Sequence, residues 1–194
     1  MIHSFSGIKR HIFILFALTA LTLPIDQLSK QYAKKNYLLV EDEFDSTVYQ
    51  GRRKEILVVG SERFWISLSE TYVRNHGASW GIWSGVNERW RSPAILLIGL
   101  VATMMLSFFA VRLLRSSQIR PAYGICGVII GSFGNMLDRL RIGYVVDFLT
   151  LKTGVGAKSV MLPSFNVADI IIVLALIWLI ATIQIPAKSK PQVS

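Results

Sequence analysis

Four long runs of apolar residues, separated by polar segments, dominate the pattern of this chain. Each run approaches the roughly 20 apolar residues that an α-helix needs to cross a lipid bilayer. The first run follows basic residues, as in a cleavable signal peptide, but it continues into polar sequence without a small-residue cleavage site. We therefore predict four transmembrane helices, at about 12–30, 93–114, 121–138 and 167–185.

The segment between the first two runs differs in character. It contains eight of the twelve acidic residues of the chain, and 55–59 and 64–72 have the composition of β-strands. We predict an all-α membrane protein with a small extramembrane β-rich unit at about 36–80, between helices 1 and 2. A second polar segment, about 149–164, contains two glycines, and we predict a flexible loop that gates the site.

Composition and charge agree with a membrane protein. Of the 194 residues, 52% are hydrophobic and 17% are charged, which is too apolar for an ordinary soluble domain of this length. The formal net charge is +9, but the basic residues are spread between the apolar runs and do not form one stripe. This distribution argues against a nucleic-acid partner and favours contact with membrane lipid.

The positions of the basic residues predict the orientation of the helices. Lysine and arginine flank the apolar runs at one end, where the flanking residues are Lys9, Arg10, Arg112, Arg115, Arg120, Lys188 and Lys190. Positive residues next to transmembrane helices favour the cytoplasmic side. Both termini are therefore expected in the cytoplasm, and 31–92 and 138–166 on the opposite side, which is the periplasmic face in a bacterium.

The remaining four acidic residues are all aspartates that adjoin apolar runs: Asp26, Asp138, Asp147 and Asp169. Because a charge at the centre of a bilayer costs roughly 2.5 to 3.5 kcal/mol or more, such residues indicate a functional site. The alternative is that they cap helix ends in the wet interface. For Asp26 and Asp138 this alternative stays open because each has basic neighbours: Lys30 lies four residues after Asp26, and arginines follow Asp138.

Two polar pairs lie beside these aspartates. If the fourth helix begins near Phe165, Asn166 and Asp169 share one face, so Asn166 can orient the carboxylate, although one of the two could be a plain N-cap. In the third helix, residues 131, 134, 135 and 138 also share a face, with two glycines followed by two polar groups. That face allows close approach of a peptide, or it is a glycine packing seam between helices.

The chemistry suited to these residues is limited. The three histidines lie outside the apolar runs and form no HExxH motif, and no GxSxG or phosphate-binding loop is present. A serine and lysine pair such as Ser29 and Lys30 is not excluded by spacing. Two carboxylates that share a proton are the simplest choice, with one as general base on a water and the other as acid.

Two other classes of protein are alternatives to an enzyme. A proton- or ion-coupled transporter also uses intramembrane carboxylates, but it needs them near mid-bilayer, whereas these lie at helix ends. A non-catalytic assembly factor would explain the glycine seam but not the aspartates.

Five short motifs resemble, in order, those of the prolipoprotein signal peptidase family, also called signal peptidase II. They are Asp26-Gln-Leu-Ser-Lys30, Asn75-His-Gly-Ala-Ser-Trp-Gly81, Gly134-Asn-Met-Leu-Asp-Arg139, Val145-Val-Asp-Phe148 and Phe165-Asn-Val-Ala-Asp169. Together these motifs span most of the chain. Two departures are an outer segment longer than the family pattern and Trp80 at a position where phenylalanine is common.

The resemblance implies an aspartic endopeptidase of the bacterial cytoplasmic membrane that cleaves prolipoproteins immediately before a diacylglyceryl cysteine. It implies that Asp147 and Asp169 are catalytic. It further implies substrate-binding or dyad-supporting roles for Asn75, Gly77, Ala78, Asn135, Arg139 and Asn166, and structural polar roles for Asp26, Lys30 and Asp138. No metal or organic cofactor is expected, and the antibiotic globomycin is expected to inhibit.

Overall fold

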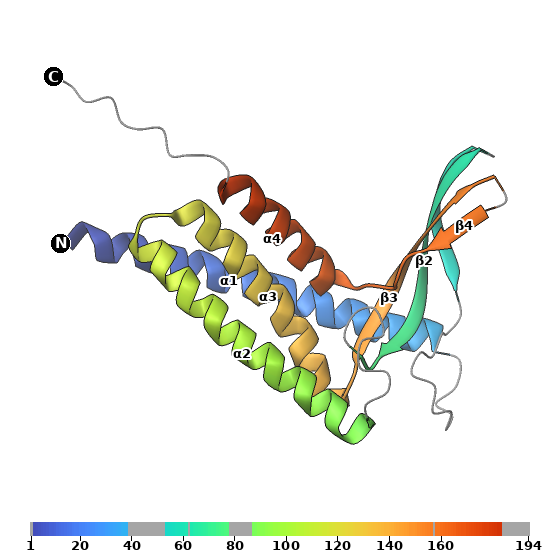
Figure 1. The fold of residues 1–194 in the computed structure, drawn as a ribbon, viewed down its shortest axis with the longest axis horizontal. Helices are drawn as coiled ribbons and strands as arrows, with labels where there is room; N and C mark the ends of the chain where they lie inside the picture. Colours follow the sequence, from blue (N-terminus) through green and yellow to red (C-terminus); the bar gives the residue numbers. More distant parts are fainter. Residues whose placement is uncertain (1, 39–52, 62, 78–86, 157, 184–194) are drawn as a thin grey trace.

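The computed structural model describes residues 2–38, 53–61, 63–77, 87–156 and 158–183 (Figure 1). Four helices and four strands follow one another along these residues. In chain order they are α1 Ile2–Tyr37, β1 Lys54–Gly60, β2 Phe64–Asn75, α2 Glu88–Arg115, α3 Ile119–Ile142, β3 Val145–Val155, β4 Lys158–Met161 and α4 Val167–Ile183.

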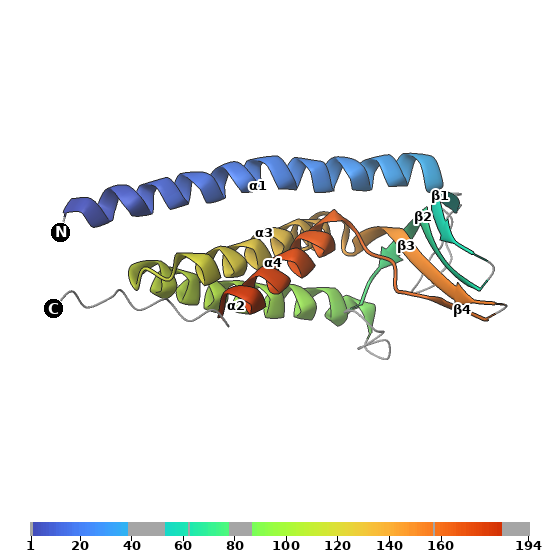
Figure 2. The same ribbon diagram turned by 90° about the horizontal axis from the view of Figure 1, so that it is seen from above.

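The four helices lie where the apolar runs predict helices, and local capping sets some of their ends. The side chain of Asn87 accepts a hydrogen bond of 3.0 Å from the backbone N–H of Arg89 at the start of α2. At the C-terminal end of α3, Gly143 adopts a left-handed φ of 81°, which ends the helix. Helices α2, α3 and α4 lie together, and α1 runs along one side of them (Figure 2).

Glycines allow α3 and α4 to approach closely. A Cβ atom on Gly127 would lie 2.7 Å from the Cβ of Ala175, and one on Gly131 would lie 2.7 Å from the carbonyl oxygen of Ala168. Side chains at these positions would force the two helices apart. The glycine packing seam considered for this face of α3 is therefore present in the structure.

The outward faces of the helices are apolar. Within the described residues, Arg10–Tyr37 and Arg89–Arg115 are long and apolar enough to cross a membrane, and α4 is a shorter apolar helix. Large exposed apolar side chains cover these helices, among them Phe13, Phe16, Leu97, Met104, Phe108, Leu174, Ile177 and Ile180. Such extended apolar surface suits lipid rather than water.

The sheet differs from the one predicted. Its strand order is β1-β2-β3-β4, every neighbouring pair is antiparallel, and β3 and β4 come from the segment between α3 and α4. The β-rich unit predicted between the first two helices is present as β1 and β2, but β3 and β4 complete the sheet. Long-range pairing of β2 with β3 joins two segments that local sequence patterns treat separately.

The predicted loop at 149–164 is also largely strand. Residues up to 155 belong to β3, residues 158–161 form β4, and Leu149 forms a bridge with Phe165. Gly154 suggested a loop, but a Cβ atom there would lie 2.6 Å from the indole ring of Trp65 on β2. This glycine makes room for the tryptophan ring across the strand pair, so its role is packing.

The sheet meets the helices at the C-terminal end of α1. Five buried apolar residues form a core there: Ala33, Tyr37, Tyr72, Val146 and Phe148. The hydroxyl of Tyr37 donates a hydrogen bond to Glu70 on β2. Because β3 belongs to this core, the strand is held beside the helices at the point where Asp147 projects from it.

Candidate active site

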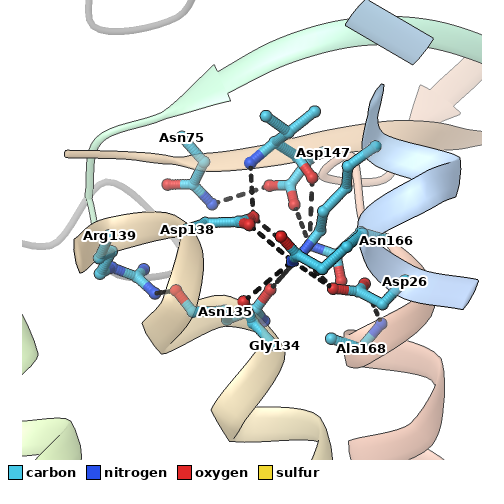
Figure 3. A network of polar contacts seen from close by, with 12 residues as sticks. Asp26, Asn75, Gly134, Asn135, Asp138, Arg139, Asp147, Asn166 and Ala168 are labelled. Atoms are coloured by element: carbon cyan, nitrogen blue, oxygen red, sulfur yellow. Dashed lines mark hydrogen bonds and ion pairs between the residues drawn. The ribbon is translucent and has the colours of Figure 1, made fainter. Parts of the chain in front are cut away.

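Asp147 on β3 and Asp169 in the first turn of α4 are joined by one residue, Asn166. The side-chain amide of Asn166 donates to Oδ1 of Asp147 at 2.7 Å. The backbone N–H of Asn166 donates to Oδ2 of Asp169 at 3.0 Å. Asn166 is fully buried, and Figure 3 shows it within a network of polar side chains from several elements.

The start of α4 places Asp169. Asn166 precedes the helix, and its Oδ1 accepts a hydrogen bond of 3.0 Å from the backbone N–H of Asp169, three residues later. With the reverse bond from the Asn166 backbone to the Asp169 carboxylate, the two residues form a reciprocal capping box. Asn166 therefore both caps the helix and orients the carboxylate, two roles that the sequence leaves as alternatives.

Asp147 is buried, with 3% of its surface exposed. In addition to Asn166, Asn75 at the end of β2 contacts it, with Nδ2 2.9 Å from Oδ2. Burial raises the pKa of Asp147 to about 7, and the negative charge of Asp169 adds to this shift. The two asparagine hydrogen bonds and the charge of Lys30 act in the opposite direction, but burial has the larger effect.

Asn135 on α3 links the aspartates to Lys30 of α1. Its Nδ2 donates to Oδ1 of Asp169 at 2.8 Å. Its Oδ1 accepts from Nζ of Lys30 at 3.0 Å and from Nδ2 of Asn166 at 3.1 Å. The orientation of this amide is therefore determined by partners on both sides.

Lys30 on α1 lies between two buried carboxylates. Its Nζ is 2.8 Å from Oδ2 of Asp26 and 2.8 Å from Oδ2 of Asp138. Asp26 in turn accepts from the backbone N–H of Ala168 at 3.0 Å, and Asp138 from that of Val146 at 3.4 Å. Lys30 and its two carboxylate partners thereby connect α1 to α3, to the start of α4 and to β3. Figure 3 shows Asp26 and Asp138 within this network.

The arginines that follow Asp138 in sequence have other partners. Arg139 donates to the backbone oxygens of Asn135, at 3.3 Å, and Gly77, at 3.2 Å. Arg141 donates to the side-chain oxygen of Gln27 at 3.4 Å. The ion pair of Asp138 is therefore with Lys30 of α1, and both arginines bond elsewhere.

Gly77, a further residue of the second motif, lies just after the end of β2. The backbone N–H of Gly77 donates to Oδ1 of Asn75 at 3.1 Å, which orients the amide toward Asp147. Ala78 and Trp80 lie outside the described residues.

The alternative pair of Ser29 and Lys30 is not arranged as a nucleophile and its base. The hydroxyl of Ser29 donates to the backbone oxygen of Asp26 at 2.8 Å, one turn earlier in α1. The ammonium group of Lys30 is instead held by the carboxylates of Asp26 and Asp138.

Some contributors to the network were missed. Gln27 donates to Asp138 at 2.8 Å and to Asp26 at 3.1 Å, and the backbone N–H groups of Val146 and Ala168 donate to carboxylates. Gln27 lies within the first motif, next to Asp26, and that position was the available signal. Backbone donors leave no side-chain signature in a sequence.

Comparisons with known proteins show the family of this chain. The family described as signal peptidase (SPase) II matches residues 18–185. A lipoprotein signal peptidase of Syntrophus aciditrophicus is 30% identical over 178 residues, covering 91% of this chain and 96% of that protein. The Moorella thermoacetica lipoprotein signal peptidase is 33% identical over 178 residues, covering 92% of this chain and 96% of the relative.

The fold also resembles a solved protein. A bacterial membrane enzyme, determined by the in meso method at 2.3 Å resolution, has a TM-score of 0.56 and 22% sequence identity. The similarity covers 93% of this chain and 94% of that enzyme, and it concerns the fold. With the family match over most of its length, this chain belongs to the signal peptidase II family and is a membrane protease.

Proposed function

We propose that this enzyme cleaves the signal peptide from diacylglyceryl-modified prolipoproteins immediately before the lipidated cysteine, with Asp147 and Asp169 as its catalytic dyad. Two relatives that align along nearly all of the chain are named lipoprotein signal peptidases, which supports this substrate class. The observation that carries the proposal is that Asn166 donates hydrogen bonds to both carboxylates. A residue that binds both carboxyl groups holds them in one site, as acid–base catalysis by a pair of aspartates requires.

The two aspartates lie in different environments, which suggests different roles. Asp169 lies in the first turn of α4, where the capping box and the helix dipole favour a negative charge. Asp147 lies on a strand and is buried, and its pKa is raised to about 7. Asp147 is therefore the acid that holds the proton, and Asp169 is the ionised general base.

Peptide hydrolysis then proceeds in two steps. Asp169 takes a proton from a water while the water oxygen bonds to the scissile carbonyl carbon, and Asp147 gives its proton to the carbonyl oxygen. The tetrahedral intermediate returns that proton to Asp147 as the carbonyl re-forms and the C–N bond breaks. The proton on Asp169 passes to the leaving amine, so both carboxyl groups regain their starting states.

The basic residues at one end of the helices support an orientation in the membrane. In this proposal all four helices cross the bacterial cytoplasmic membrane, with both termini in the cytoplasm and the dyad at the periplasmic face. The start of α1, the turn between α2 and α3 and the last turn of α4 lie at the end away from the sheet (Figure 1). Arg112, Arg115 and Arg120 lie at that end, as the positive-inside rule requires.

Two expectations from the family resemblance remain part of the proposal. Cleavage requires no metal or organic cofactor, because water and two carboxyl groups supply the chemistry. Globomycin is expected to inhibit by occupying the substrate site. Membrane lipid surrounds the helices and gives the lipid chains of the substrate access from the bilayer.

The test compares wild type with Asp147→Asn and Asp169→Asn on a diacylglyceryl-modified prolipoprotein. Each substitution is expected to lower kcat by at least about a thousandfold, because general acid–base catalysis is lost and no carboxyl group replaces it. Glu55→Gln, on the exposed β1 strand, is the matched control and should retain wild-type activity. A folded Asp147→Asn or Asp169→Asn variant with near-full activity would overturn the dyad, and an inert wild type would overturn the substrate class.

A further inference from the structure

The outer half of the sheet has two unlike faces. Residues directly opposite each other in antiparallel strands share a face, so the registers Val59 with Ile66 and Phe64 with Val155 define one side. Six residues form what we call the apolar face: Leu57, Val59, Phe64, Ile66, Val155 and Val160. All six are exposed, from 38% for Ile66 to 66% for Val155.

The opposite face is more mixed in character. The ring of Trp65 lies over Gly154, and Nζ of Lys152 is 5.4 Å from the centroid of that ring. The hydroxyl of Ser67 donates to Glu55 on β1 at 3.1 Å. This face combines the exposed apolar residues Val58 and Met161 with an aromatic ring and polar contacts, whereas the apolar face carries six exposed hydrocarbon side chains beside Thr153 and Lys158.

The apolar face lies on the side of the sheet that meets the helices. Following the same alternation toward the dyad, Glu70 and its register partner Leu149 project from this side. Glu70 accepts a hydrogen bond from Tyr37 of α1, and Leu149 packs against the core that also contacts Val167 of α4. Figure 1 shows the strands continuing from there away from the helices.

Basic residues border this face. Lys54 lies at the start of β1, Arg63 directly precedes β2, and Lys158 begins β4 opposite Val155. All three basic residues are exposed. Apolar and aromatic groups flanked by lysine and arginine match the interface of a bilayer that contains anionic lipid.

We propose that the apolar face is a second membrane contact, which lies in the periplasmic interface of the bilayer beside the helices and favours anionic phospholipid. The proposal goes beyond peptide cleavage and rests on the proposed orientation of the helices. Strand β3 carries Asp147 near one end and Val155 at the other. A lipid-seated outer sheet would therefore hold the acid of the dyad at a constant depth relative to the membrane surface.

Adjacent residues of β1 provide a matched test. Val58 and Val59 are 57% and 58% exposed but belong to opposite faces, since Val58 pairs with Ser67 and Val59 with Ile66. Each is changed to cysteine in the full-length Cys126→Ser protein, spin-labelled and reconstituted in bilayers of phosphatidylcholine with one third phosphatidylglycerol. Collision rates are measured with oxygen, which concentrates in lipid, and with a water-soluble nickel chelate.

The label at Val59 should favour oxygen and the label at Val58 should favour the nickel chelate. Adding Arg63→Gln and Lys158→Gln should move the Val59 label toward water by about tenfold or more in the population ratio, since each basic group near an anionic surface contributes about 1 kcal/mol. Water-like collision rates for both labels would overturn the proposal. Dipolar broadening at Val59 would also overturn it, because a second copy of the chain would then cover the face.

Prolipoprotein cleavage is measured on the same samples to separate this inference from the proposed function. Active protein with the Val59 label in water contradicts the membrane contact and leaves the function intact. Inactive protein with the Val59 label in lipid, with the unlabelled wild type inactive as well, supports the contact and contradicts the function.

Discussion

Asn166 and Asp169 cap the start of α4 for each other, with both hydrogen bonds at 3.0 Å. The same Asn166 side chain donates to Asp147 at 2.7 Å. A helix cap has thereby become the link between the two proposed catalytic carboxyl groups. The stability of α4 and the geometry of the dyad consequently depend on one side chain, and this coupling can be tested.

Substitution of Asn166 separates the two roles. Asn166→Ala should destabilise the protein by about 1 kcal/mol through loss of the cap, and it should also abolish most activity because Asp147 loses a donor. Asn166→Ser keeps an oxygen that can cap but has no amide donor for Asp147. It should regain most of the lost stability but little activity, measured by thermal unfolding in detergent and by prolipoprotein cleavage. Equal recovery of both properties would contradict this division of roles.

Replacement of Lys30 should cost much stability. Lys30→Met leaves Asp26 and Asp138 buried without their cation, which should destabilise the protein by about 3 to 5 kcal/mol. Adding Asp138→Asn removes one uncompensated charge, so the double variant should be more stable than the sum of the single changes predicts. Lys35→Met, at an exposed position on the same helix, should change stability by less than about 0.5 kcal/mol. Thermal unfolding of the four variants measures these differences, and simple additivity would argue against the shared ion pair.

The glycine seam should respond differently from other helix glycines. Gly131→Ala places a methyl group 2.7 Å from the carbonyl oxygen of Ala168, so α4 and with it Asp169 must shift. We expect about 1 to 3 kcal/mol of destabilisation and lower kcat. At Gly99 on α2 the added Cβ would lie 3.6 Å from the Met136 side chain, an ordinary contact. Gly99→Ala should therefore be neutral or slightly stabilising, and an equal loss in both variants would show that the seam is not tight.

The pH dependence of cleavage should report on Asp147. Its pKa of about 7 means that the carboxyl group is protonated below that pH and loses its proton above it, so activity should fall on the alkaline side of about pH 7. The folded protein holds this proton at a pH where the unfolded chain, with a pKa near 3.8, has released it. This contribution to stability is complete below about pH 4 and is lost as pH rises through about 7.

Asn75→Ala should move that alkaline limb. The amide of Asn75 donates to the ionised form of Asp147 and lowers its pKa, so its removal should shift the limb to higher pH. The measurement is the pH profile of kcat/KM, with Asn36→Ala as control, because Asn36 is exposed at the end of α1 and bonds only to the backbone of Tyr32 among the contacts described. A limb that moves to lower pH would mean that Asp147 is not the proton donor.

Local sequence patterns were sufficient for several features. The apolar runs determined four helices, because helix formation and lipid exposure follow from residues adjacent in the chain. The spacing of Asp26 and Lys30 determined an ion pair within one helix, and the small residues of α3 determined a close helix contact. The positions of Asn166 and Asp169 likewise predicted that they share a face at the start of α4.

The tertiary structure decided what those patterns leave open. The pairing of β2 with β3 turned a predicted loop into sheet, and it placed Asn75 against Asp147, 72 residues away. The packing of α1 against α3 gave Asp138 a lysine as partner, 108 positions earlier in the chain, in place of its neighbouring arginines. Contacts between residues so far apart depend on how helices and strands pack, and the periodicity of a single segment carries no information about its packing partner.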